Sequence, residues 1–266
     1  MTLHHRVIGQ GRPVVVLHGV TLDHRHMVEL LEPAFERLDG WQRIYVDLPG
    51  HGQSPPQDNI HSQDGILAAV ESFIAEKLGE SRFALVGLSR GSYIARGIMY
   101  RHAERVTGAA LIVPGGNPGS VHPLPPHEVL EPDVSIRPRL SQDELWAFDN
   151  FLVVQRRDIV KKRRNVLKPA MQCHDPAQEA RVRAAFAFSF ADEEERARFE
   201  RPSLIVAGRQ DSWSGYHDSI DLMHRFPRAT LAILDAAGHG LGFERADLLT
   251  ALVRDWLQRL AVAWHD

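Results

Sequence analysis

The stretch that decides the fold is Phe83-Ala84-Leu85-Val86-Gly87-Leu88-Ser89-Arg90-Gly91. A short apolar run, which predicts a buried strand, leads into the pattern G-x-S-x-G, and helical spacing follows from Gly91 to Tyr100. A strand that turns this sharply into a helix holds the serine at the apex in a strained conformation. Glycine is needed two residues on either side, because a Cβ there would clash within the turn. We therefore expect Ser89 to be a nucleophile between strand and helix; the alternative is an ordinary turn with a surface serine.

Apolar runs alternate with helical segments on both sides of this motif. The runs that are typical of buried strands are Val14–Leu17, Arg43–Asp47, Ala109–Val113, Ser203–Gly208 and Leu231–Leu234. Apolar residues at helical spacing lie between several of these runs, over Met27–Leu38 and Ile66–Leu78. A further helical pattern, Ala246–Trp264, follows the last run. This order predicts an α/β fold: a mostly parallel twisted sheet with helices on both faces.

The alternation stops between residues 115 and 201. Glycines and prolines dominate the first part of this stretch, and helical patterns follow. Ser141-Gln142-Asp143-Glu144 is a capping-box pattern that predicts a helix continuing through Val153, and a further helix is expected over Ala177–Phe190. Because strands of one sheet lie on both sides, we expect residues 115–201 to be an inserted helical cap. The core would then comprise residues 1–114 and 202–266.

Composition excludes several classes of protein. The 266 residues are 44% hydrophobic and 24% charged, typical of a globular chain, and the net charge of −3 offers no general basic field for nucleic acid. The longest apolar runs are far shorter than the ~20 residues of a membrane span, and no signal peptide is visible. With a single cysteine, Cys173, the expected location is the cytoplasm. The 15 histidines are scattered without metal-ligand spacing, so we expect no metal site.

Two residues near the C-terminus complete a candidate catalytic set. A serine hydroxyl needs a general base, and that base needs an acid to orient it. His239 follows the strand Leu231–Leu234, and Asp211 follows the strand before it. The rival position for the acid, at residues 115–117, holds no carboxylate. The alternatives are a capping or surface role for His239, and for Asp211 an N-cap role ahead of a helix near Gly215–Phe226.

Taken together, five segments resemble the α/β-hydrolase fold superfamily along the whole chain. They are Leu17-His18-Gly19, Asp47-Leu48-Pro49-Gly50-His51-Gly52-Gln53-Ser54, Gly87–Gly91, Gly208-Arg209-Gln210-Asp211 and Gly238-His239. The resemblance implies a serine hydrolase with a helical cap and no cofactor. It also implies that the backbone N–H of Val20 serves in an oxyanion hole; the N–H of Arg90, directly after the nucleophile, is the expected second donor. We expect His18 to brace its loop and His51 to be a fixed turn residue.

The expected reaction is hydrolysis of a small-to-medium acyl substrate, most simply a carboxylic ester, by a monomer or homodimer that binds neither nucleic acid nor membrane. One alternative is a carbon–carbon bond (vinylogous diketone) hydrolase or lyase on the same triad. Against it, meta-cleavage hydrolases usually have a Trp soon after the catalytic histidine, whereas this chain has Gly240-Leu241-Gly242-Phe243. Another alternative is a ligand-binding receptor with slow turnover.

Three features of the chain permit two interpretations each. Between Arg156 and Lys168, seven Lys and Arg face one Asp; they form either a solvated helix face balanced by Asp192–Glu195 or a recruiting site for anions. Arg90 either pairs with an acid or binds a substrate carboxylate. Four aromatic residues either form an apolar pocket roof or pack inside the cap: Trp146, Phe148, Phe186 and Phe188.

Overall fold

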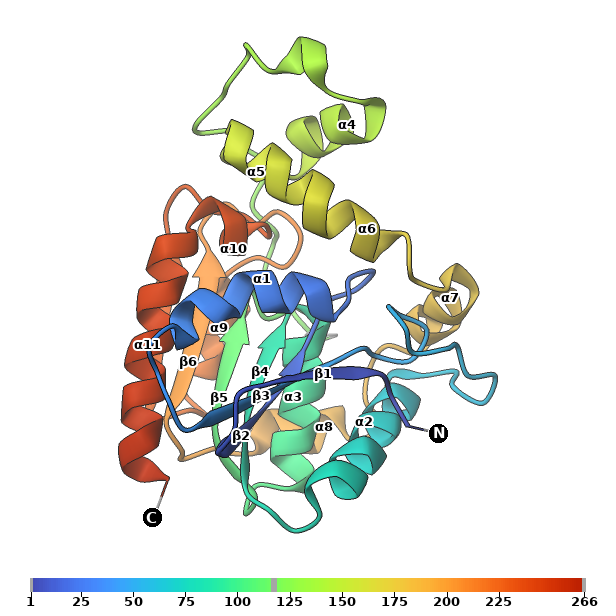
Figure 1. Ribbon diagram of the computed structural model, residues 1–266, viewed down its shortest axis with the longest axis vertical. Coiled ribbons are helices and arrows are strands. Elements are labelled where there is room, and N and C mark those ends of the chain that lie inside the picture. Colours follow the sequence, from blue (N-terminus) through green and yellow to red (C-terminus); the bar gives the residue numbers. More distant parts are fainter. Residues whose placement is uncertain (1, 116–118, 265–266) are drawn as a thin grey trace.

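A seven-stranded sheet lies at the centre of the computed structural model, which describes residues 2–115 and 119–264 (Figure 1). The strand order is β1-β3-β2-β4-β5-β6-β7. The strands are β1 (His5–Ile8), β2 (Arg12–Leu17), β3 (Trp41–Val46), β4 (Phe83–Leu88), β5 (Val106–Ile112), β6 (Ser203–Gly208) and β7 (Ala229–Leu234). Only β1 runs antiparallel to its neighbour, β3. The expected mostly parallel α/β sheet is therefore confirmed, whereas β1 was not expected, because its sequence HRVI contains no apolar run.

Helices cover both faces of the sheet, as expected. Alternate side chains of a strand point to opposite faces, so Val14 and Val16 of β2 pack with α1 and α11, while Val15 and Leu17 pack with α2 and α3. The helices of this part are α1 (His24–Phe35), α2 (Gln63–Leu78), α3 (Arg90–Arg101), α9 (His217–Leu222), α10 (Leu241–Glu244) and α11 (Ala246–Ala263). On each face of the sheet, the strands and helices share one continuous apolar cluster, and this packing holds the strands in position.

Between β5 and β6 the described residues form helices but add no strand to the sheet. These elements are η1 (Arg137–Arg139), α4 (Gln142–Asn150), α5 (Arg157–Lys162), the π-helical turn η2 (Arg163–Leu167), α6 (Lys168–Met171), α7 (Pro176–Ala184) and α8 (Ala191–Arg196). In Figure 1, α4, α5 and α6 stand over the carboxyl ends of the strands, whereas α7 lies to the side and α8 lies lower, next to α3. The segment therefore has two parts that cover different regions of the sheet layer.

Two helices of this segment end earlier than their sequences suggest. The capping box of α4 is present, with the Ser141 N–H donating to Glu144 Oε2 at 2.9 Å, but α4 ends at Asn150 instead of continuing through Val153. Beyond it, the N–H groups of Val153 and Val154 donate to Glu244 of α10, a partner that no local pattern reveals. Similarly, α7 ends at Ala184 rather than near Phe190.

Among the described residues, no helix has both the length and the apolar character needed to cross a membrane.

Candidate active site

The turn that carries Ser89 joins the end of β4 directly to the start of α3. Ser89 has φ +52° and ψ −118°, a backbone conformation that a residue with a Cβ rarely adopts. A Cβ on Gly87 would lie 2.4 Å from the Gly91 carbonyl oxygen, and one on Gly91 would lie 2.3 Å from the Leu17 carbonyl oxygen. The predicted need for glycine at both positions is confirmed, and backbone atoms impose it.

The structure brings Ser89, His239 and Asp211 together at the carboxyl ends of β4, β7 and β6. Ser89 Oγ lies 3.1 Å from His239 Nε2, and His239 Nδ1 lies 2.9 Å from Asp211 Oδ2. With the proton on Nδ1, the ring donates to Asp211 and can accept the Ser89 proton at Nε2. Asp211 is fully buried and His239 is partly buried. These distances satisfy the geometric requirements of a nucleophile, its base and the group that orients the base.

Asp211 is not the helix N-cap that the sequence left open as an alternative, because α9 begins at His217 with Tyr216 before it; its carboxylate instead holds the turn after β6. Its Oδ1 accepts the backbone N–H groups of Trp213 and Ser214, each at 2.9 Å, while its Oδ2 faces His239. The Ser214 hydroxyl lies 3.2 Å from His239 Nδ1, a contact that sequence reasoning missed. The only available signal was the proximity of Ser214 to Asp211 in the chain. The carboxylate is therefore held rigidly, with one oxygen aimed at the imidazole.

His239 has a raised pKa. Burial by itself would lower it, but the charge of Asp211 and its hydrogen bond outweigh burial, with a further contribution from the charge of Glu244. A base with an elevated pKa is a stronger proton acceptor from Ser89, provided that the pH keeps it neutral.

The loop after β2 passes close to Ser89. A Cβ on Gly19 would lie 3.3 Å from Ser89 Cβ, and Val20 and Arg90 both line the cavity next to Ser89. His18 holds this loop: its Nε2 accepts the Leu48 N–H at 2.9 Å, and its Nδ1 lies 2.8 Å from the Gly19 carbonyl oxygen. Burial lowers the pKa of His18 to about 3, so the ring is neutral. The predicted bracing role of His18 is confirmed.

A cavity of about 450 Å³ opens above Ser89 and His239. Of the four aromatic residues singled out in the sequence, Trp146 and Phe186 line this cavity. Phe148 instead packs inside the apolar cluster formed with α5, and Phe188 stacks on Tyr93 of α3 with ring centroids 4.1 Å apart. Two of the four therefore line the cavity, because Phe148 is buried within its own apolar cluster and Phe188 packs on α3.

Arg90 pairs with an acid of the chain. Its guanidinium donates two hydrogen bonds to Glu179 of α7, at 2.5 and 2.7 Å, and both side chains are buried. Burial by itself would raise the pKa of Glu179, but the hydrogen bond and charge of Arg90 dominate and lower it. The alternative, a free Arg90 that binds a substrate carboxylate, is therefore wrong.

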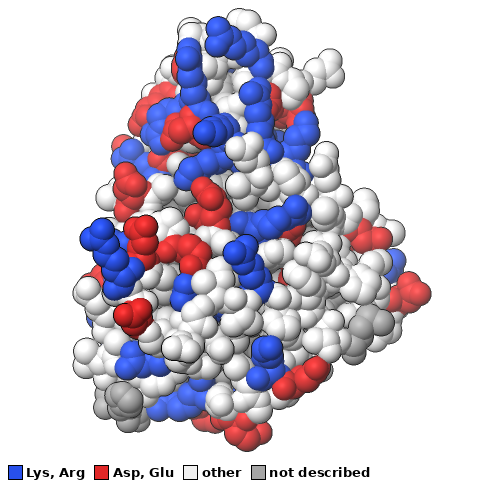
Figure 2. Space-filling view, viewed as in Figure 1, with Lys and Arg blue, Asp and Glu red and all other residues white. Residues whose placement is uncertain are grey.

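Most of the basic residues between Arg156 and Lys168 pair with nearby acids. In Figure 2, blue side chains gather over the upper part of the face, with red ones among them. The acids in these pairs are Glu29, Glu131, Asp133, Asp143, Glu144 and Asp158. The expectation that Asp192–Glu195 would balance this stretch is wrong, because Glu194 is buried against Arg96 and Arg225.

Glu244 is a buried acid that sequence reasoning missed. Besides the N–H groups of Val153 and Val154, it accepts the Gly238 N–H at 2.7 Å, next to His239. Burial raises its pKa, although these hydrogen bonds oppose the effect. Glu244 thus ties the loop that carries His239 to the chain after α4.

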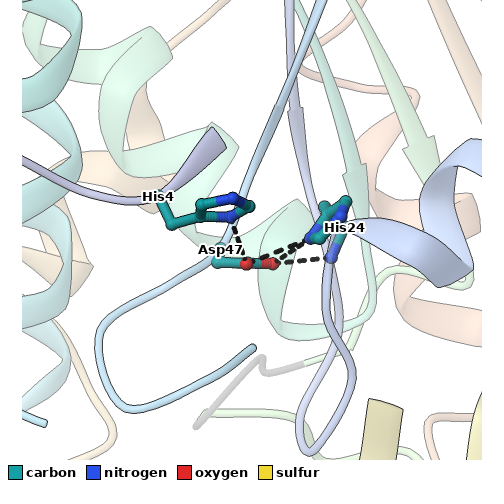
Figure 3. Close-up of side chains that lie close together, drawn as sticks. All are labelled: His4, His24 and Asp47. Atoms are coloured by element: carbon teal, nitrogen blue, oxygen red, sulfur yellow. Dashed lines mark hydrogen bonds and ion pairs between the residues drawn. The ribbon is translucent and has the colours of Figure 1, made fainter. Parts of the chain in front are cut away.

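A second buried carboxylate, Asp47, lies between two histidines (Figure 3). His4 Nδ1 lies 2.7 Å from Asp47 Oδ2, and His24 Nδ1 lies 2.9 Å from Oδ1. Asp47 also accepts the backbone N–H groups of His24 and Gln53, and the pKa of the carboxyl is held far below its usual range. These three side chains are close enough to hold a metal ion. Hydrogen bonds from both histidines and two backbone N–H groups already satisfy the Asp47 carboxylate. The three side chains therefore form a hydrogen-bonded network, which joins the chain before β1, the end of β3 and the start of α1.

Known proteins resemble this chain in both sequence and fold. Residues 12–246 match the model of the alpha/beta hydrolase fold family. A 2-hydroxy-6-oxononadienedioate/2-hydroxy-6-oxononatrienedioate hydrolase from Pseudomonas putida is 26% identical over 97% of this chain and 92% of its own. Among solved structures, an alpha/beta superfamily hydrolase from Oenococcus oeni PSU-1 superposes with a TM-score of 0.88 at 24% identity, covering 98% of both chains. An esterase from Rhodococcus sp. ECU1013 superposes with a TM-score of 0.72 at 22% identity, covering 96% of this chain and 94% of its own.

The match to the family model extends from β2 to the start of α11 and includes Ser89, Asp211 and His239. The chain therefore belongs to the alpha/beta hydrolase fold family and is a hydrolase enzyme.

Proposed function

We propose that this hydrolase cleaves carboxylic esters through an acyl-enzyme formed on Ser89. The observation that carries the proposal is the continuous chain of contacts from Ser89 Oγ to His239 and on to Asp211, at 3.1 and 2.9 Å. A neutral imidazole that is oriented by a buried carboxylate makes a serine hydroxyl an effective nucleophile.

In the first half of the reaction, Ser89 Oγ attacks the ester carbonyl carbon while its proton moves to His239 Nε2. The backbone N–H groups of Val20 and Arg90 stabilise the resulting oxyanion, and the N-terminus of α3 adds a favourable dipole. The tetrahedral intermediate expels the alcohol, which leaves with the proton from His239. Asp211 stabilises the imidazolium throughout and keeps the proton on Nδ1.

In the second half, water attacks the acyl-enzyme and gives its proton to His239. Ser89 leaves as the product acid forms, and His239 returns the proton to Ser89 Oγ. Every step uses only groups of the chain and water.

We also propose that residues 115–201 act as a cap that selects the substrate on the core of residues 1–114 and 202–266. The roof of the cavity comes partly from this segment, through Trp146, Leu167 and Met171. The triad, in contrast, lies entirely outside it. On this division, residues of the core carry out the reaction, and the cap determines which acyl groups fit the cavity.

A second candidate is hydrolysis of a carbon–carbon bond on the same triad. The Pseudomonas putida relative, named for a 2-hydroxy-6-oxo diacid, supports this candidate over nearly the full length of the chain. The residue after His239 favours the ester, since Gly240 adds no side chain to the cavity, where meta-cleavage hydrolases usually have a Trp nearby.

A substrate panel with product analysis tests the proposal. We expect release of p-nitrophenol from short p-nitrophenyl esters, with loss of nearly all turnover in Ser89→Ala and no change in its circular dichroism. Cleavage of a vinylogous diketone with no ester hydrolysis would favour the second candidate. Binding of the esters without turnover by the wild type would indicate a receptor.

A further inference from the structure

Positive charge dominates the cavity above Ser89. Three arginines line it, Arg90, Arg163 and Arg183, and no Asp or Glu is found among its described lining residues. One acid, Glu179, pairs with both Arg90 at 2.5 Å and Arg183 at 3.5 Å. Asp211 lies behind His239 and pairs with that ring. The internal acids therefore leave one cation of the cavity without a counter-charge.

Arg163 is that cation. Within residues 2–115 and 119–264, its side chain forms no ion pair and no hydrogen bond, in contrast to its neighbours Lys162 and Arg164, which pair with Glu29 and Glu144. The nearest acids are committed elsewhere, since Asp143 pairs with Lys168. Burial lowers the pKa of Arg163, and the charges of Asp143 and Glu144 offset this only in part. A guanidinium that is partly desolvated and unpaired is an unfavourable arrangement, which a bound anion would relieve.

The local helix geometry directs Arg163 into the cavity. Arg163 opens the π-helical turn η2, in which the Lys168 N–H donates to the Arg163 carbonyl oxygen. Arg163, Leu167 and Met171 all line the cavity, so one stripe of the continuous helix from α5 to α6 faces it. π-Helical turns of this kind occur frequently at functional sites. The cation therefore stands at one end of an apolar stripe on the wall of the cavity.

From these contacts we propose that Arg163 binds a carboxylate carried by the substrate, so that the preferred substrates are half-esters of aliphatic dicarboxylic acids. This inference rests on the proposed ester hydrolysis at Ser89. One unpaired guanidinium balances one negative charge, which fits a carboxylate better than a phosphate dianion, and its planar fork matches the two carboxylate oxygens. The apolar walls, including Trp146 and Phe151, suit the hydrocarbon spacer between the two ends.

The test compares two series of activated esters of matched chain length. One series consists of the mono-p-nitrophenyl esters of succinate, glutarate, adipate and suberate; the other consists of the p-nitrophenyl esters of the corresponding uncharged alkanoic acids. We expect the wild type to prefer the charged series at one spacer length. Arg163→Gln should lower kcat/KM on that half-ester about 10- to 100-fold, the effect of losing a charge-assisted hydrogen bond, with little change on the alkanoate. Arg163→Lys should retain part of the preference.

The matched control is Lys161→Gln. It removes the same charge from the same helix, but Lys161 is exposed and lies outside the cavity lining. We expect this variant to keep the wild-type preference. Equal activity of the wild type on both series, or a loss in Arg163→Gln that is the same on both, would overturn the carboxylate site. The proposed function fails separately, if Ser89→Ala hydrolyses the alkanoates at the wild-type rate.

Discussion

Arg90 and Glu179 join the helix that follows Ser89 to the segment between β5 and β6 through two hydrogen bonds of 2.5 and 2.7 Å. Arg90 is the residue after Ser89, and Glu179 lies on α7, so the pair connects the active-site turn to a distant part of the chain. Since both side chains are buried, water cannot replace either partner if the other is removed.

Removing one partner of this pair should destabilise the protein strongly. We expect Glu179→Ala to lower the free energy of unfolding by about 3–5 kcal/mol, because it leaves a buried guanidinium without its main counter-charge. The double variant Arg90→Met with Glu179→Leu should recover much of this loss. Urea denaturation of the single and double variants measures both quantities, and single variants within about 1 kcal/mol of the wild type would show that the pair is not buried in solution.

Gly91 should tolerate no side chain. The Cβ of Gly91→Ala would lie 2.3 Å from the Leu17 carbonyl oxygen, so either α3 or β2 must move. We expect a clear fall in melting temperature together with a loss of esterase activity, because the same shift displaces Ser89. Gly65→Ala on α2 is the control: its nearest contact is Ile60 Cγ2 at 3.3 Å, and alanine favours a helix by up to about 1 kcal/mol. Equal stability of the two variants would contradict the model of the turn.

The pH dependence of activity should report His239. Because Asp211 raises the pKa of His239, the protonated and inactive form persists to a higher pH than for an ordinary histidine. The acidic limb of kcat/KM should therefore lie above pH 6.5, with activity rising as the pH increases through it. In Asp211→Asn, residual activity should fall greatly and the limb should move to lower pH. An acidic limb that stays in place in Asp211→Asn would show that another group controls it.

Glu244 should contribute to stability in a pH-dependent way. Its pKa is raised in the folded protein, so the folded state holds the proton to a higher pH than the unfolded chain does. The contribution of Glu244 to stability is thus largest at low pH and decreases as the pH rises from about 4.5 through the folded pKa.

Glu244→Gln checks this sign. The amide lacks one of the two acceptor oxygens, so we expect the variant to be less stable by about 1–3 kcal/mol, with the difference from the wild type narrowing as the pH rises. Denaturation curves at several pH values measure this difference. A gap that widens with pH would mean that the carboxylate is stabilised, rather than penalised, in its ionised form.

The sequence predicted the central part of the fold because local backbone requirements determine it. The strand–serine–helix turn needs glycine at positions 87 and 91, and both glycines can be recognised directly in the sequence motif. The strands that carry Asp211 and His239 are likewise continuous apolar runs with the candidate residues at their ends.

Features that depend on contacts between distant segments left no such signal. Glu244 accepts backbone N–H groups of the chain after α4, and Ser214 reaches His239 because the turn after β6 brings it there. β1 pairs with the edge strand β3, although its own sequence, HRVI, has too few apolar residues to predict a strand. The ion pair between Arg90 and Glu179 holds α7 next to α3. No periodicity in the sequence indicates that these two helices are neighbours.

The most direct test of the central claim is the mass of the protein after reaction with a fluorophosphonate, followed by peptide mapping. If Ser89 is activated by His239 and Asp211, the wild type should gain one adduct, located on Ser89, and Asp211→Asn should acquire it far more slowly. Ser89→Ala should gain none. An adduct on another residue, or labelling of Ser89→Ala at the rate of the wild type, would contradict the assignment of Ser89 as the nucleophile.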